Sequence, residues 1–291
     1  MLPYRVAIAG CARDCAQYLP AVFANIDRLS SLFAHVEVVI AYDESRDETE
    51  ACLLQKIQEQ EQEQKRSLTL LPQTGPLSPV RTQRISAARN RILMHFRKRE
   101  RMDPSQRLDY LLMMDLDDVC AAPMHVDRLL PFFPGGKEQQ EQQQEQEQEQ
   151  WDALSFHRSD YYDIWALSFF PFVISCWNFG EYQKSLSVVH TMRRHILSIL
   201  DARSSLLPVE SAFNGFGIYR WSAFRDCWYD WTTLDMHLIP SETMKANIDA
   251  VGGLSPQYRP YADDCEHRAF HRQAIAKHGA RIRIAPVKLF E

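Results

Sequence analysis

Three carboxylates, Asp115, Asp117 and Asp118, follow an apolar run that begins at Leu108. An apolar run with acids at its end is typical of a buried strand of an α/β sheet, and ligands bind at the carboxyl ends of such strands. Clustered carboxylates repel one another unless a cation lies among them. The pattern predicts a divalent metal, Mn²⁺ or Mg²⁺, held by oxygen ligands and itself holding a phosphate. The alternative is a solvated loop after a strand.

Two earlier apolar runs also end in polar turns. Residues 5–10 predict a first strand, and Arg13 follows it either as a phosphate contact or as an ordinary surface residue. Residues 36–42 predict a second strand, and Asp43 at its end is suited to accept a hydrogen bond from a base or a ribose. Both turns are therefore expected at the ligand edge of the sheet.

Helical periodicity connects these strands. Apolar residues at three- and four-residue spacing predict helices over residues 16–33 and from Val80 to Phe96, the second with arginines on its polar face. A solvated helix is expected over residues 53–66, and Ser45 or Asp47 is suited to cap it.

The segment from 135 to 150 differs in composition from the rest of the chain. After Gly135, Gly136 and Lys137 it contains only Glu and Gln, which cannot bury apolar surface. A strand-like run resumes at once at Trp151, so the tract is expected to be a disordered loop within one domain. The whole chain, residues 1–291, is therefore predicted to form a single domain.

The last third of the chain contains two further candidate segments. Gly215 and Gly217 precede a short apolar strand, where glycine lets the backbone approach a ligand or simply make a turn. A helix starting near Asp263 would place Asp263, His267 and His271 on one face, which is a weak metal-ligand pattern. Residues 280–285 predict a closing edge strand.

Composition excludes several function classes. A net charge of -5 provides no excess of cations for a nucleic-acid backbone, so no nucleic-acid partner is expected. Seven cysteines without paired spacing indicate neither a disulfide framework nor a structural zinc. No run of eighteen apolar residues predicts a membrane span. These features favour a cytoplasmic protein, and a lumenal domain without its anchor would share them.

The order of these segments resembles that of nucleotide-sugar glycosyltransferases of the GT-A fold. More narrowly, the chain is similar to the fungal capsule-associated and α-1,3-mannosyltransferase-like family, and more loosely to the Golgi mannan-polymerase subunits. The matching segments are residues 41–49, 85–91, 115–119, 162–166 and 213–217. The resemblance implies an α/β fold with a Rossmann-like mixed sheet flanked by helices.

The resemblance also implies a function, which is metal-dependent transfer of a sugar from a UDP- or GDP-linked donor to a glycan acceptor, with a leaning towards retention of configuration. It places Asp43 near the base and Asp115 near the ribose. Asp117 would bind the metal with Asp115, and His267 would complete the metal sphere. The residues expected to bind the donor are Arg13, Asp43, Arg84, Arg89, Asp115, Asn214 and Gly215.

Chemistry at the acceptor requires a group that orients its hydroxyl or takes its proton. Glu210, Asp264 and Glu266, with Asp263 beside them, are the candidates. The cation at Asp117 would stabilise the negative charge that develops on the departing nucleoside diphosphate.

Two rival functions fit the same residues. An apolar strand followed by Asp-x-Asp is also the first motif of haloacid-dehalogenase-type phosphatases, in which Asp115 would be the nucleophile and Asp117 the general acid. Against this, 107 residues with two or three strands precede the motif. The other rival is a non-catalytic subunit that only binds a sugar nucleotide.

Overall fold

The chain was analysed as a computed structural model that describes residues 1–63, 67–134, 150–234, 236–257 and 263–290. It comprises two compact units, each assembled from separate stretches of sequence. The first unit contains Met1–Gln150, Gly215–Asp226 and Leu289–Glu291, and the second contains Trp151–Asn214 and Cys227–Lys288. The predicted Glu/Gln loop at 135–150 lies, apart from Gln150, outside the described residues.

Five strands of the first unit lie side by side in a sheet in the order β3-β2-β1-β4-β7. The first four strands are parallel, and β7 is antiparallel to β4, so this sheet is mixed. Its strands are β1 (Leu2–Ala12), β2 (Phe33–Tyr42), β3 (Ser67–Pro72), β4 (Tyr110–Asp115) and β7 (Phe216–Arg220). Its helices are α1 (Leu19–Ser30), α2 (Thr49–Glu63), α3 (Arg81–Met102) and α5 (Trp221–Phe224), with short 3₁₀ turns at Pro104–Gln106 (η1), Asp118–Cys120 (η2) and Val126–Phe132 (η3).

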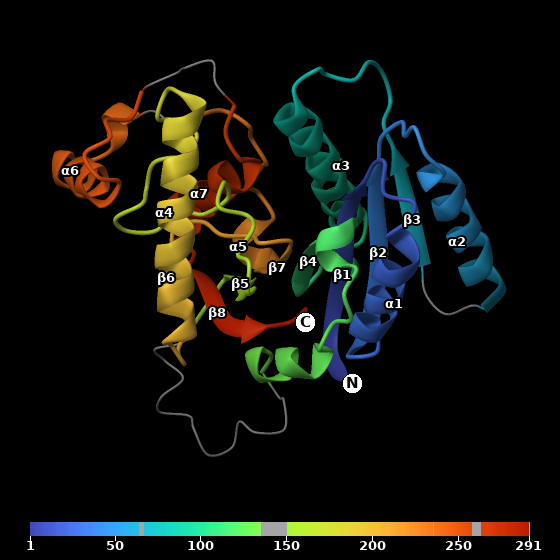
Figure 1. Cartoon of the computed structure of the whole chain (residues 1–291). Helices are drawn as coiled ribbons and strands as arrows, with labels where there is room; N and C mark the ends of the chain where they lie inside the picture. The colour runs from blue at the N-terminus through green and yellow to red at the C-terminus, as the bar shows by residue number, and fades with distance from the viewer. Residues whose placement is uncertain (64–66, 135–149, 235, 258–262, 291) are drawn as a thin grey trace. The chain divides into compact units, whose positions relative to one another are not determined.

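Helices flank this sheet, as the sequence predicts. Helix α3 packs on β1 and β2, α1 on β2, and α2 on β3 (Figure 1). The central strands are fully buried, as expected for parallel strands covered on both faces; the residues Leu111–Met114 of β4 are at most 1% exposed. Phe33, which the sequence places at the end of a helix, instead begins β2, because α1 ends at Ser30 and the chain turns before it.

Gly10 allows β1 and β4 to lie close together. A Cβ atom at this position would lie 2.5 Å from the backbone oxygen of Met114 and 2.7 Å from Cγ of Leu116. The residue that follows Gly10 in β1, Cys11, is paired with Asp115 at the end of β4. The glycine therefore helps to place the first acid of the Asp-x-Asp motif beside the turn that follows β1.

The second unit has a smaller mixed sheet, in which β8 lies between β5 and β6. Strand β8 (Ile282–Lys288) is parallel to β5 (Ala153–His157) and antiparallel to β6 (Leu207–Val209), so the expectation of an edge strand at 280–285 is wrong. Its helices are α4 (Tyr182–Asp201), drawn in yellow in Figure 1, α6 (Ser241–Ala250) and α7 (Glu266–His278), with a 3₁₀ turn at Met236–Leu238 (η5).

The α/β class and the mixed sheet flanked by helices are confirmed. The single domain over residues 1–291 stays a prediction, because it concerns how the two units combine. Within the described residues, no helix combines the length and apolar character that crossing a bilayer requires.

Candidate functional site

The carboxyl ends of β1, β2 and β4 bring the predicted acids of the first unit to one edge of its sheet. In the register of the sheet, Cys11 of β1 pairs with Ala41 of β2 on one side and with Asp115 of β4 on the other. Asp43 follows β2 by one residue, and Asp117 follows β4 by two. The edge predicted to bind ligand therefore carries a carboxylate on each side of β1.

Asp43 is held by a cation from α3. Nη2 of Arg91 lies 3.1 Å from Oδ1 of Asp43, and the two side chains are 17% and 10% exposed. Arg91 also donates to the side-chain oxygen of Gln73, which follows β3. Among the described residues, no hydrogen bond reaches Oδ2 of Asp43, so that oxygen remains available to accept one from a base or a ribose.

Asp115 is held by a second arginine of the same helix. Nη2 of Arg89 lies 3.2 Å from Oδ1 of Asp115, and the Arg89 side chain is 7% exposed. The backbone N–H of Asp115 donates to the carbonyl oxygen of Gly215 at 2.9 Å, and the thiol of Cys120 donates to the same oxygen at 3.2 Å. Gly215 has a φ of 87°, a conformation that favours glycine. Its backbone thus fixes the end of β4.

Asp117 caps the short turn η2, which begins at Asp118. Its Oδ1 accepts a hydrogen bond from the backbone N–H of Val119 at 3.2 Å. Burial, together with the negative charges of Asp115 and Asp118, raises the pKa of Asp117 to about 6. The ionised form is therefore disfavoured by its surroundings, which is the condition that a bound cation relieves. Hard oxygen donors of this kind fit Mn²⁺ or Mg²⁺.

Several hydrogen bonds join the turn after β1 to the turn after β2, and Arg13 lies in the turn after β1. The backbone N–H groups of Asp14, Cys15 and Ala16 donate to side-chain oxygens of Ser45, Thr49 and Asp47. In return, Asp14 accepts from the backbone N–H of Arg46 at 2.6 Å.

Asp47 caps α2, as the sequence predicts, because its Oδ1 accepts from the N–H and the hydroxyl of Thr49. The Arg13 side chain is about one third exposed, and its Nε lies 3.6 Å from Oδ2 of Asp14. It is therefore accessible at this edge.

Arg84 is placed differently from Arg89. Its Nη1 donates to the backbone oxygens of Ser78 at 2.6 Å and Pro79 at 3.0 Å, so it fixes the loop that precedes α3. These bonds give Arg84 a structural role, and its predicted contact with a cofactor stays a prediction.

Two of the predicted residues of the second unit form bonds within that unit. Asn214 is 3% exposed; its Nδ2 donates to the backbone oxygen of Phe156, and its backbone N–H donates to Asp163. Glu210 is exposed, and its Oε2 accepts from the hydroxyl of Ser168 at 2.9 Å. Asn214 therefore positions a loop, whereas Glu210 remains accessible to solvent.

Asp264 is buried in an ion pair, and both of its oxygens accept hydrogen bonds. Oδ2 lies 3.1 Å from Nε of Arg268, while Oδ1 accepts from the indole N–H of Trp165 and from the backbone N–H of Cys265. Both members of the ion pair are 1% exposed. This geometry indicates a structural role, because a general base must reach its proton.

Glu266 and His267 lie at the start of α7, and both are buried. The helix begins at Glu266, so Asp263 precedes it and forms a bridge with Thr232. The expectation that Asp263 shares a helix face with His267 and His271 is therefore wrong, because Asp263 lies outside the helix. The His267 ring stacks on Phe213, with centroids 3.9 Å apart, and its Nε2 lies 3.9 Å from Oε1 of Glu266. The assignment of His267 to a metal sphere stays a prediction.

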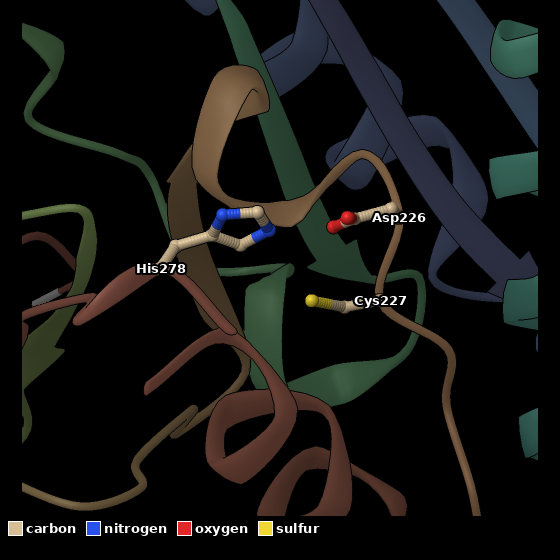
Figure 2. A group of neighbouring side chains, drawn as sticks. All are labelled: Asp226, Cys227 and His278. Atoms are coloured by element: carbon tan, nitrogen blue, oxygen red, sulfur yellow. The ribbon is translucent and has the colours of Figure 1, made fainter. Parts of the chain in front are cut away.

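A cysteine and a histidine that the sequence analysis did not single out lie near each other in the second unit. Figure 2 shows the side chains of Cys227 and His278, whose ligand atoms are within 4.8 Å. The third residue drawn there, Asp226, belongs to the other unit, and we assign no site to this group.

Comparisons with known proteins gave matches only among solved structures. No family model matches the chain, and no curated protein does. S. aureus TarS 1-349 is 11% identical with a TM-score of 0.40, covering 98% of this chain and 59% of that one. The mannosyltransferase PcManGT from Pyrobaculum calidifontis, in complex with GDP-Man and Mn²⁺, is 12% identical with a TM-score of 0.42, covering 99% and 58%.

A third similar structure is glucosyl-3-phosphoglycerate synthase from Mycobacterium tuberculosis in complex with Mn²⁺, UDP and glucosyl-3-phosphoglycerate. It is 13% identical with a TM-score of 0.38, covering 94% of this chain and 78% of that one. The chain thus spans less than two thirds of the first two structures. All three TM-scores lie below 0.5.

One residue of the site was missed at the sequence level. The sequence pattern places Arg91 only among the arginines of the polar helix face, yet it is the partner of Asp43. The spacing of the two arginines is the signal that could indicate this pairing. Arg89 and Arg91 are two residues apart in α3, and they pair with Asp115 and Asp43 at the ends of two different strands.

Proposed function

We propose that the chain is a glycosyltransferase that uses a nucleoside-diphosphate sugar and a divalent cation. The observation that carries the proposal is the edge of the first unit's sheet, where Asp43 and Asp115 are each held by an arginine of α3 and Asp117 has a raised pKa. A carboxylate that is paired with an arginine is held in one orientation and can accept a hydrogen bond from a ligand. A carboxylate whose ionised form is disfavoured is instead suited to bind a cation.

Each acid has a distinct role in this proposal. Asp43 accepts a hydrogen bond from the base through Oδ2, while Arg91 fixes its Oδ1. Asp115, oriented by Arg89, bonds the ribose and contributes an oxygen to the metal. Asp117 binds the metal. A cation bound here would stabilise the negative charge of the departing diphosphate.

Cations of the same edge complete the donor site in this proposal. Arg13 is accessible and contacts a phosphate, and the backbone at Gly215 approaches the donor. The resemblance to the fungal mannosyltransferase-like family favours GDP-mannose as the first donor to test. It also implies that the product retains the configuration of the donor sugar.

The acceptor base is proposed to be Glu210. A group that takes a proton from an acceptor hydroxyl must be accessible, and Glu210 is exposed, whereas Asp264 and Glu266 are at most 4% exposed. The ion pair between Asp264 and Arg268 further favours Glu210.

Nucleotide binding tests the donor half of the proposal. We expect GDP or UDP to raise the melting temperature of the full chain in the presence of Mn²⁺, because a ligand that binds only the folded state stabilises it by mass action. The effect should be lost in Asp117→Asn and retained in Asp118→Asn. A Mn²⁺-dependent shift of unchanged size in Asp117→Asn would refute the metal assignment.

An assay of donor turnover distinguishes a glycosyltransferase from a phosphatase and from a non-catalytic binding subunit. Incubation with GDP-mannose, UDP-glucose and Mn²⁺ should release the nucleoside diphosphate, and this release should fall at least 100-fold in Asp117→Asn. Nucleotide binding without turnover on any donor would indicate a non-catalytic subunit. A fluoride-trapped phosphoenzyme on Asp115 would indicate a phosphatase. The anomeric configuration of a product, read by NMR, tests retention.

A further inference from the structure

A cavity of about 720 Å³ lies in the first unit at the opposite edge of its sheet, where β1, β2 and β3 begin. Six residues between Arg5 at this edge and Cys11 at the other span about 20 Å of extended strand, so the cavity is separate from the acids described above. Its volume falls in the range of small-molecule sites. Its charged and amide side chains are Arg5, Asp27, His35, Glu37, Lys56, Gln60, Arg99 and Gln106.

The lining carries the three cations Arg5, Lys56 and Arg99 against the two carboxylates Asp27 and Glu37, so positive charge is in excess. Glu37 is already bound by Arg99 and by His95, whose Nε2 lies 2.9 Å from Oε1 of Glu37. Among the described residues, the guanidinium of Arg5 forms one hydrogen bond, to the amide oxygen of Gln106 at 3.3 Å. Burial lowers the pKa of Arg99, and the charge of Arg5 lowers it further, so the two cations lie close enough to repel each other.

The acids near Arg5 and Lys56 are themselves engaged. Asp103 accepts hydrogen bonds from Ser105 and Gln106. Lys56 lies 3.1 Å from Glu59, and its side chain is about one quarter exposed. An anion placed beside Arg5 and Arg99 would therefore relieve their repulsion and gain charge-assisted hydrogen bonds.

A buried amide points to a ligand with hydroxyl groups. Gln60 lines the cavity and is 6% exposed, and its Oε1 has no hydrogen-bond partner among the described residues. A buried polar atom without a partner is costly, so a hydroxyl donor from a ligand would be favourable there. The hydroxyls of Ser31 and Ser67 and the amide of Gln106 add further polar groups to the lining.

From this lining we infer that the cavity binds a small phosphorylated polyol of the sugar-phosphate class. Arg5 and Arg99 hold the phosphate, and the Gln60 amide accepts a hydrogen bond from a hydroxyl of the polyol. The site uses none of the residues at the donor edge, so it stands independently of the proposed function.

Calorimetry with the full chain tests this site. We expect mannose 6-phosphate or glucose 6-phosphate to bind more tightly than inorganic phosphate, and the free hexoses not to bind. Arg5→Gln should weaken hexose-phosphate binding at least tenfold. The matched control is Arg101→Gln, an exposed arginine at the end of the same helix as Arg99, which should leave binding unchanged.

A second variant separates recognition of the polyol from recognition of charge. Gln60→Leu should weaken hexose-phosphate binding and leave inorganic phosphate binding unchanged, which a general loss of folding would not produce. Asp117→Asn should bind hexose phosphates normally, so failure of the donor site and failure of this site are distinguishable. Equal binding by Arg5→Gln and the unmodified chain, or no hexose-phosphate binding at all, would overturn the inference.

Discussion

Replacing Asp117 with asparagine should stabilise the metal-free protein at neutral pH. Raising the pKa of this carboxyl from 3.8 to about 6 costs the ionised form about 3 kcal/mol in the folded state. Because the side chain is partly exposed, water screens part of this cost, and we expect a gain of about 1 to 2 kcal/mol. Asparagine keeps an oxygen for the N–H of Val119, so the turn at η2 is preserved.

The sign of the effect fixes its pH dependence. Below pH 3.8 the carboxyl is protonated in both the folded and unfolded states, so it contributes no cost. Between pH 3.8 and about 6, the carboxyl ionises in the unfolded chain before it ionises in the folded one, so the cost to the folded state grows. The cost reaches its full size above about pH 6. The asparagine variant is neutral throughout, so its advantage should appear only as the pH rises.

The assay is thermal unfolding with EDTA at pH 4.5 and 7.5. A gain of this size corresponds to roughly 2 to 5 °C at pH 7.5, with a smaller difference at pH 4.5. Addition of Mn²⁺ should reverse the order, because only the carboxylate is stabilised by the cation. A lower melting temperature for Asp117→Asn than for the unmodified chain at pH 7.5 in EDTA would refute the electrostatic reasoning.

Three substitutions test the packing and ion pairs that support the fold. Arg91→Gln leaves the carboxylate of Asp43 without its cation and should cost about 1 to 3 kcal/mol in denaturant unfolding; an unchanged midpoint would contradict the pairing. Arg268→Met leaves Asp264 charged and buried, and should cost about 3 to 5 kcal/mol, with partial recovery when Asp264→Asn is added. Gly10→Ala forces a methyl group against the backbone of β4 and should lower stability by about 3 kcal/mol; an unchanged midpoint would contradict the close approach of β1 and β4.

The elements that carry the acids could be predicted because each depends on a local pattern. The apolar residues Leu111–Met114 are buried in β4 as their run indicates, and the acids follow at its end. The capping of α2 by Asp47 was also readable, since short polar side chains before a helix bond its first N–H groups.

Pairings between distant segments could not be read in this way. Arg91 and Asp43 are 48 residues apart, and no periodicity connects them. The position of β8 between β5 and β6 likewise depends on how separate segments combine, so an apolar run at the chain's end gave no indication of it. Asp264 and Arg268 are the exception, because their four-residue spacing is itself a recognisable pairing pattern.

The discontinuous make-up of the two units limits how the chain can be divided. The first unit is interrupted after Gln150 and resumes at Gly215, and the segment that returns supplies β7, the antiparallel neighbour of β4. A fragment ending at residue 150 would therefore expose the N–H and C=O groups of β4 along a new sheet edge, which invites aggregation. It would also lose the carbonyl of Gly215 that holds Asp115. A circular permutant or a graft of residues 215–226 onto the fragment, rather than simple truncation, is the way to obtain the donor edge in isolation.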